Sequence, residues 1–440
     1  MSSATFVGGR GLDRPRSRQV AGRRQVLSPP RLRVAVAAAA VAALPLLRPS
    51  GPANSAPVDL LVALALILSV YCGVGNGERW RFPYAFPMLL FLGGGAIGAL
   101  AGPVPINGLS ALVQDVVLLT WCWTLINICR SASSLRVVAR AWAYGSIVWG
   151  ILLFVGLATG TAALSGRTTK DASRTMLTFG DPNVAANFLF ISIMVIWATQ
   201  IPRHRSLRLT GYALLVAAMV TTGSNSGLVS IIVGVMVAGF LGLYRRAGAV
   251  AAVTMICFAL CGLYAVGSNI NLISIQDRAQ ASRWSFIRDG IGRQESSVEQ
   301  RGSILHESLH LYQVGGPFGA GPASTKPRLQ AEQAPFVKEA HDDYLAALTE
   351  RGLIGLLGVA LLVGGVALQA ITLVRRRLTP DFAAVIVRPN ALVGAIAGTL
   401  LTMTVVELLH ARHVWTLFAV VAALSLWGGD RVAHKTRKRT

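Results

Sequence analysis

Apolar runs of roughly 15 to 22 residues recur along this chain of 440 residues, separated by short breaks that are polar or contain glycine and proline. Runs of this length suit a helix that crosses a bilayer. They lack the two-residue alternation of an outer-membrane barrel strand. Twelve spans are predicted, starting near Val34, Val58, Pro83, Leu109, Trp142, Val184, Leu209, Gly227, Ala249, Leu353, Ala391 and Val414. The pattern therefore predicts an all-α integral membrane protein with about twelve transmembrane helices.

One long polar segment interrupts this pattern between predicted spans nine and ten. A long loop in an otherwise tightly connected bundle is typically functional, so we expect it to hold the active site. The predicted division is a basic, disordered cytoplasmic tail (1–33), helices one to nine (34–267), the large extracytoplasmic loop (268–352), helices ten to twelve (353–428) and a second basic cytoplasmic tail (429–440).

Composition agrees with a membrane protein. The chain is 53% hydrophobic and 14% charged, with a mean hydropathy of +0.56, whereas a soluble protein carries about 25% charged residues. The five cysteines lie within or beside apolar runs, so no disulfide framework is predicted in the loop. Cys257 and Cys261 are one helical turn apart, and ordinary packing is favoured over a metal pair. We predict neither a metal nor a cofactor.

The net charge of +22 reflects short basic clusters between the spans rather than a basic domain. Such clusters set topology, because loops rich in Lys and Arg stay in the cytoplasm. Placing both termini inside puts most of the 41 Lys and Arg residues on the cytoplasmic side. The distribution predicts a multi-pass protein of the cytoplasmic (inner) membrane that contacts membrane lipid and no nucleic acid, with the large loop outside.

Two stretches of the loop region could carry chemistry. "EQRGSILHESLHLYQVGGPFGAGPAST" (299–325) predicts a helix ended by a glycine-rich turn. That turn either only ends the helix or brings the backbone of Gly319 and Gly321 close to a ligand phosphate. "EAHDDYLAALTERGLIGLLG" (339–358) places His341 before a helix with acidic first-turn residues. His341 is then a surface histidine, a general base or, less favoured, a metal ligand with Asp342 or Asp343.

These stretches resemble the O-antigen ligase and polymerase family of membrane glycan transferases. "HDDYL" and "TERGLIGL" are similar to its His-Asn-x-Tyr-Leu … Glu-x-Gly-Leu-Ile-Gly signature. Arg301 matches the arginine that opens its "R-x-x-x-W … P-x-x-G-x-G" block, with Leu305 in place of the tryptophan. "FGDPNVAANF" (179–188) and "TGSNSGLVS" (222–230) correspond to two earlier blocks. The resemblance covers roughly residues 58–428.

Two positions depart from the family pattern. Asn225 stands where the family has an arginine in its Ser-Arg-Gly block, and Asp342 stands where it has an asparagine. If the missing arginine normally holds a phosphate, its loss removes roughly 1.5–3 kcal/mol of charge-assisted hydrogen bonding. Cations predicted on the same side that could replace it are Arg174, Arg283, Arg288, Arg293 and Arg412.

The resemblance implies transfer or polymerisation of glycan from an undecaprenyl-diphosphate-linked donor onto a glycan or lipid-anchored acceptor, outside the cytoplasmic membrane. The implied enzyme is a metal-independent, inverting glycosyltransferase of cell-surface polysaccharide biosynthesis. His341 would be the base, and Arg301 would bind the leaving diphosphate. The residues predicted to bind substrate are Gly319, Gly321, Asp342, Tyr344, Asn225, Asn183, Arg174 and Arg293.

Two other function classes stay open at this point. The first is a twelve-span polysaccharide or small-molecule transporter or flippase. Ionisable residues within the spans are scarce beyond Asp59, Asp115 and Glu407, which disfavours coupled transport. The second is a binding or scaffold protein, for which Asn225 is the best support. Ligase and polymerase are not distinguished by these residues.

Overall fold

The computed structural model describes residues 28–48, 50–51, 55–75, 77–167, 174–269, 278, 281–282, 296–334, 337 and 342–429. Its helices are α1 (Pro29–Ala42), α2 (Pro57–Gly75), α3 (Ala85–Ala101), α4 (Pro105–Ile128), α5 (Ala132–Thr159), α6 (Ala162–Ser165), α7 (Pro182–Thr199), α8 (Arg205–Thr221), α9 (Asn225–Asn269), α12 (Ser296–Gly315), α13 (Thr325–Ala331), α14 (Asp343–Arg375), α15 (Pro380–Ala383), α16 (Pro389–Thr402) and α17 (Arg412–Trp427). One isolated bridge between Leu378 and Gly429 is the only extended pairing in these ranges. The predicted all-α class is confirmed.

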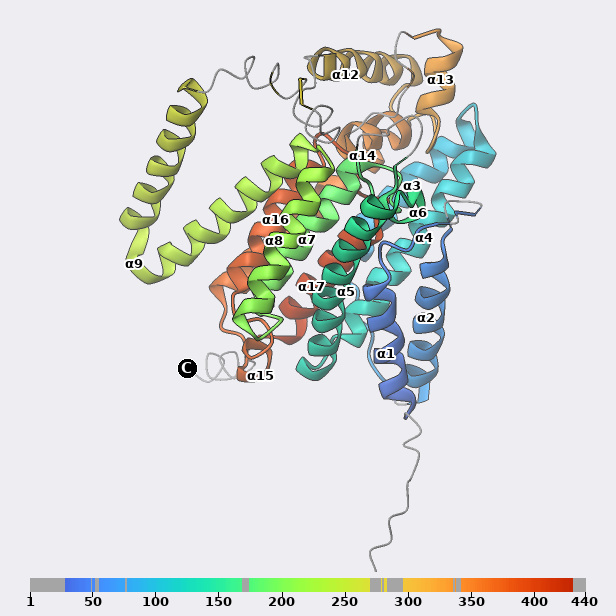
Figure 1. The fold of residues 1–440 in the computed structure, drawn as a ribbon. Helices are drawn as coiled ribbons and strands as arrows, with labels where there is room; N and C mark the ends of the chain where they lie inside the picture. Colours follow the sequence, from blue (N-terminus) through green and yellow to red (C-terminus); the bar gives the residue numbers. More distant parts are fainter. Residues whose placement is uncertain are drawn as a thin grey trace, which may run out of the picture.

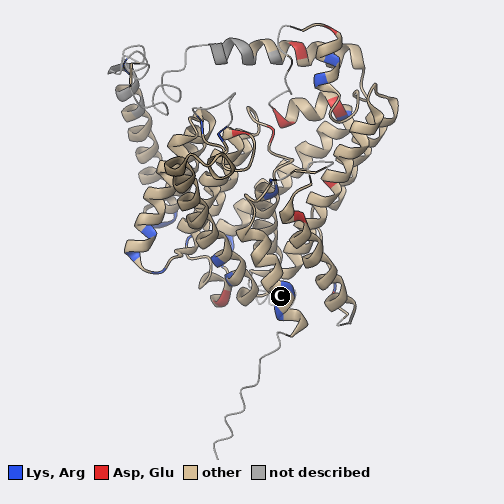
Figure 2. Ribbon diagram, turned by 45° about the vertical axis from the view of Figure 1, so that its right-hand side comes forward, with Lys and Arg blue, Asp and Glu red and all other residues tan. Residues whose placement is uncertain are grey.

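The long helices form a bundle with two different ends (Figure 1). α12 and α13 lie across one end, which we call the loop end. α15 lies at the other, where α1 also begins and α17 also finishes. We call that one the basic end, because the Arg203–Arg208 and Arg375–Arg377 clusters lie there. Figure 2 shows many of the described basic residues around it, and a smaller group at the loop end. Among the described residues, the structure therefore groups most of the arginines that we predicted on one side.

Six helices in the described part of the chain are long and apolar enough to cross a membrane. They are Pro57–Val74, Pro105–Ile128, Ala132–Thr159, Pro182–Thr199, Asn225–Gly262 and Asp343–Arg375, and α3, α16 and α17 are shorter apolar helices. α9 covers predicted spans eight and nine as one element, bent at Gly248, where the backbone leaves helical geometry at φ +84°. The count of twelve spans stays a prediction.

α7 forms the centre of the bundle. Almost all its side chains are buried, and α5, α8, α9, α16 and α17 pack around it. Its start is set by Asp181, whose Oδ1 accepts hydrogen bonds from the backbone N–H of Asn183 (2.6 Å) and of Val184 (3.2 Å). Such a cap satisfies N–H groups that the first helical turn cannot pair.

α3 and α14 approach each other until their backbones touch. A Cβ added to Gly94 would lie 2.6 Å from the carbonyl oxygen of Arg351, and one added to Gly98 would lie 2.7 Å from that of Glu350. On α14, a Cβ on Gly358 would lie 2.6 Å from the amide nitrogen of Phe91. Small residues permit this close packing, which stabilises helix pairs in membranes through van der Waals contact.

Candidate functional site

The start of α14 is built by the two aspartates of "HDDYL". Asp342 is the N-cap, and its Oδ1 accepts hydrogen bonds from the N–H of Tyr344 (2.8 Å) and of Leu345 (2.9 Å). Partial burial raises the pKa of the Asp342 carboxyl above its ordinary value, and these two hydrogen bonds oppose that shift. The helix therefore begins at Asp343, ten residues before the predicted span start at Leu353.

Asp343 and Tyr344 fasten this helix start to the segment between α16 and α17 and to the end of α16. The buried Asp343 carboxylate accepts hydrogen bonds from the N–H of Leu408 (2.7 Å) and of Leu409 (3.0 Å). The Tyr344 hydroxyl donates to the carbonyl oxygen of Leu400 at 3.2 Å. The predicted acidic helix start is confirmed, and it holds two later segments of the chain in place.

The glycine-rich turn packs on a kink in α14. Gly319 and Gly321 have left-handed φ angles of +75° and +92°, and the kink lies at Gly352, with φ +64°. The N–H of Gly321 donates to the carbonyl oxygen of Glu350 at 2.8 Å. A Cβ on Gly319 would lie 2.5 Å from the nitrogen of Gly352. The close approach in the structure is therefore to the protein's own backbone, while a role toward phosphate stays a prediction.

Beside this kink, Arg351 forms an ion pair that the sequence did not reveal. Its guanidinium lies 2.8 Å from the carboxylate of Asp115 on α4 and 3.8 Å from the centre of the Phe91 ring. Both charged side chains are nearly buried. Removing one partner of such a pair typically costs about 3–5 kcal/mol because it leaves an unpaired charge.

A polar cluster at the loop end joins two of the sequence blocks, and we call it the Arg174 cluster. Arg174 is buried; its Nε donates to the carbonyl oxygen of Thr222 (2.8 Å), and its Nη2 donates to Oδ1 of Asn183 (3.3 Å). The Ser224 hydroxyl donates to the same Oδ1 at 2.8 Å. Asn225 follows, exposed, at the first residue of α9. The structure thus brings a cation to the block that lacks the family arginine.

A cavity of about 190 Å³ adjoins the same start of α7. Its polar lining includes Arg48, His410 and Arg412, and Phe179 and Val184 contribute from the "FGDPN" block. Arg412 forms a two-point ion pair with the carboxylate of Asp59. Because Asp343 holds Leu408 and Leu409 directly before His410, the cavity and the start of α14 are connected through one short segment.

The sequence reasoning missed the histidines of this segment. His413 is buried against the rings of Phe179 and Phe188, with its Nε2 3.1 Å from Oδ1 of Asn187. His410 lines the cavity. The run "HARH" (410–413) at the start of the last apolar span was an available signal, because ionisable residues are rare there.

The remaining predicted residues are only partly placed. His341 and Arg293 lie outside the described residues, as do Arg283 and Arg288. Arg301 belongs to α12 at the loop end, and its side chain is outside the description. The structure joins Arg174 and Asn183 to Thr222 and Ser224, which directly precede Asn225 in the chain. It places Gly319, Gly321, Asp342 and Tyr344 along the turn and the start of α14.

Comparison with known families adds the deciding observation: residues 210–360 match the family described as O-Antigen ligase. The chain contains an O-antigen ligase domain. The match runs from α8 to the first half of α14 and includes Asn225, the glycine-rich turn and "HDDYL". A comparison with curated proteins found no match. With its apolar helices, the O-antigen ligase domain makes the chain a multi-pass inner-membrane protein of polysaccharide biosynthesis.

Proposed function

We propose that the protein transfers or polymerises glycan from an undecaprenyl-diphosphate-linked donor onto a glycan or lipid-anchored acceptor hydroxyl, outside the cytoplasmic membrane. The observation that carries this proposal is the continuity of the loop end. The Arg174 cluster and the cavity with Arg48 and Arg412 both adjoin the first turn of α7. Asp343 connects that cavity to the start of α14. These cations support the proposal, because a lipid-linked diphosphate needs positive charge where it binds.

The proposed reaction is one displacement. The acceptor oxygen attacks the anomeric carbon, the bond from that carbon to the phosphate oxygen breaks, and the lipid diphosphate leaves with the electron pair. His341 takes the hydroxyl proton as general base. Arg301 stabilises the charge that develops on the diphosphate, and a single displacement inverts the anomeric centre. Because diphosphate is already a good leaving group, arginine side chains supply the charge stabilisation in this proposal without a metal.

The substrate-binding roles follow the same order along the site. Arg174, which is held by Asn183, supplies the positive charge that an asparagine at position 225 does not provide, and Arg293 adds a second positive charge. Asp342 and Tyr344 position the chain next to His341. Gly319 and Gly321 hold the glycine-rich turn close to α14. The observed pairing of Asp59 with Arg412 and of Asp115 with Arg351 gives little support to the alternative of ion-coupled transport.

Replacement of the two proposed catalytic residues tests this function. We expect His341→Ala and Arg301→Ala to abolish release of undecaprenyl diphosphate from a lipid-linked glycan by the purified protein in nanodiscs. His310→Ala on α12 and Arg205→Ala at the basic end are matched controls with exposed side chains, and they should retain activity. Wild-type transfer by either catalytic variant would refute the assignment. A deletion strain should accumulate lipid-linked glycan and lose polymer. A deletion strain that keeps its polymer and accumulates no lipid-linked glycan would favour another function.

A further inference from the structure

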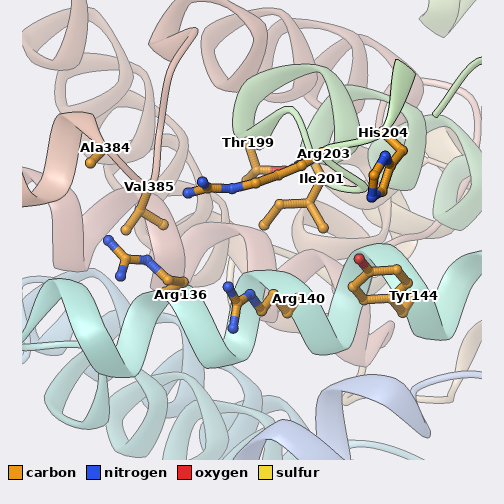
Figure 3. A pocket seen from close by; sticks show the side chains of 9 residues that line it. All are labelled: Arg136, Arg140, Tyr144, Thr199, Ile201, Arg203, His204, Ala384 and Val385. Atoms are coloured by element: carbon orange, nitrogen blue, oxygen red, sulfur yellow. Dashed lines mark hydrogen bonds between the residues drawn. The ribbon is translucent and has the colours of Figure 1, made fainter. Parts of the chain in front are cut away.

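A second, larger cavity of about 360 Å³ lies at the basic end, away from the site described above. Figure 3 shows its lining: Arg136, Arg140 and Tyr144 from α5 face Thr199, Ile201, Arg203 and His204 from the end of α7 and the link to α8, with Ala384 and Val385 beside them. A cavity of this size falls in the range of about 300–1,000 Å³ that is typical of small-molecule sites.

The cavity concentrates positive charge without a compensating acid. Arg136 and Arg140 are one helical turn apart on α5, and Arg203 reaches toward them from the opposite wall (Figure 3). No carboxylate belongs to the lining residues, and none of these three arginines forms an ion pair within the described ranges. The Nε of Arg136 is buried without a hydrogen-bond partner there. Buried donors normally have partners, so the cavity is suited to an anion that accepts several hydrogen bonds.

The surface of α5 indicates which kind of anion. From Tyr144, the exposed apolar side chains Val148, Ile151 and Val155 continue along the helix at four- and three-residue spacing. Residues at this spacing share one face of a helix. Tyr144 is 48% exposed, Val148 51% and Ile151 49%. A cluster of guanidinium groups at a helix end, followed by an exposed apolar stripe, matches a phosphate headgroup followed by its acyl chains.

We propose that this cavity binds the phosphate headgroup of an anionic membrane phospholipid, whose acyl chains lie along the apolar face of α5. Arg136, Arg140 and Arg203 donate hydrogen bonds to the phosphate oxygens. Basic pockets between transmembrane helices bind such headgroups in other membrane proteins. The bound lipid bridges α5, the α7–α8 link and the segment after α15, and thereby stabilises the packing of the basic end.

Lipid titration of the purified full-length protein in neutral detergent tests this site. Bound lipid is counted by native mass spectrometry with dioleoylphosphatidylglycerol or dioleoylphosphatidylcholine, and sodium diphosphate is titrated separately. We expect the wild type to prefer the anionic lipid. Arg136→Gln with Arg140→Gln should weaken its binding about tenfold, because two charge-assisted hydrogen bonds are lost. The matched control removes Arg245 and Arg246, two exposed arginines on α9 outside the cavity, by the same substitution. This control should bind like the wild type.

Several outcomes would overturn the proposal. Equally weakened binding of the anionic lipid in both double variants would show that only net charge matters. Unchanged binding in both would show that the cavity does not bind this lipid. Sodium diphosphate that binds more tightly than the anionic lipid and displaces it would assign the cavity to a soluble anion. If the Arg136 and Arg140 variant does not fold, Arg203→Gln, on the exposed link, decides: unchanged affinity for the anionic lipid contradicts the proposal.

Discussion

Individual residues of this protein have roles that depend on partners far away in sequence. Arg174 is an example, because its guanidinium binds Thr222 and Asn183 and so reaches the sequence block in which Asn225 replaces the family arginine. Arginine forms hydrogen bonds in several directions at once, which lets one side chain organise a loop and present charge to a phosphate. The substitution at Asn225 is therefore compatible with activity if Arg174 supplies the missing charge.

Replacing Arg174 tests this compensation directly. We expect Arg174→Ala to lower the rate of glycan transfer about 10- to 100-fold, which corresponds to about 1.5–3 kcal/mol of charge-assisted hydrogen bonding. Adding Asn225→Arg to that variant should restore much of the rate, since it returns a cation to the same block. Arg167→Ala, which removes a cation between α6 and α7, serves as the control. Failure of the second substitution to restore any transfer would argue against compensation.

At the scale of elements, glycines decide where helices can meet. Gly352 has a left-handed φ of +64°, and a Cβ there would run into the backbone of Pro317 and Phe318. Gly364 lies later in the same helix, and a Cβ there would have no neighbour within 4 Å. Two glycines of one helix thus differ in function: the first permits the kink and the contact with the glycine-rich turn, whereas the second does neither.

These two glycines give a matched pair of variants. Gly352→Ala should strongly destabilise the protein, because it adds an unfavourable φ and a clash with fixed backbone. Gly364→Ala should be neutral or should stabilise by up to about 1 kcal/mol, since alanine favours a helix more than glycine does. Thermal unfolding in detergent measures both. A Gly352→Ala protein as stable as the wild type would contradict the described packing of the turn on α14.

Another contact between elements responds to pH. Glu78, after α2, accepts hydrogen bonds from Arg33 of α1 at 2.9 and 3.1 Å, and Arg130 lies 3.4 Å away. The hydrogen bond from Arg33 is the largest cause that lowers the pKa of Glu78 below its ordinary value, and the positive charges of Arg33 and Arg130 add to it. A carboxylate with a lowered folded pKa stabilises the native state fully above its unfolded pKa, about 4.3, and loses that effect as the pH falls through the folded value.

Glu78→Gln should therefore destabilise the protein by about 1–2 kcal/mol at pH 7, after allowance for partial exposure of the pair. The difference from the wild type should shrink as the pH falls through the lowered pKa of Glu78, because both side chains are then neutral. Thermal unfolding at a series of pH values measures it. Asp381→Asn, which changes an exposed acid on α15, should show no comparable effect. A difference that is independent of pH would contradict a charge-based role for Glu78.

At the scale of the whole molecule, the two ends of the bundle are expected to face opposite sides of the membrane. The loop end carries α12, α13 and the Arg174 cluster, and the basic end carries the arginine clusters (Figures 1 and 2). Arginine-rich segments remain in the cytoplasm during insertion. Hence the loop end should face outward, as the proposed use of a lipid-linked donor requires.

Cysteine labelling in intact cells tests this orientation. In a background with Cys257→Ser and Cys261→Ser, which removes the two exposed cysteines, Gln330→Cys on α13 should react with a membrane-impermeant maleimide before lysis. Arg376→Cys, after α14, should react only afterwards. Both positions are exposed in the structure, so access to the reagent is the variable. The reverse pattern would place the proposed site in the cytoplasm and contradict the proposed function.

Sequence reasoning predicted what depends on local patterns. Hydropathy gave the all-α class, and the "HDDYL" motif gave the acidic start of α14, because capping involves residues within one turn. Local patterns could not predict the hydrogen bond from Arg174 to Thr222 or the ion pair of Arg351 with Asp115, since those contacts join segments 48 and 236 positions apart. The break in α9 at Gly248 lies where the sequence analysis divided predicted spans eight and nine, because a glycine that follows two arginines is itself a local signal.

The backbone contact between α3 and α14 has a mechanical consequence. Gly94 and Gly98 of α3 contact the backbone of α14 directly. If either helix rotated, a larger side chain would replace a glycine at this contact and clash with the backbone of the other helix. The glycine-rich turn is attached to the same pair. These three segments therefore move together as one rigid body. Such a body suits a reaction that needs its groups held still between turnovers. In the proposed reaction, the lipid-linked donor would then have to enter between other helices of the bundle.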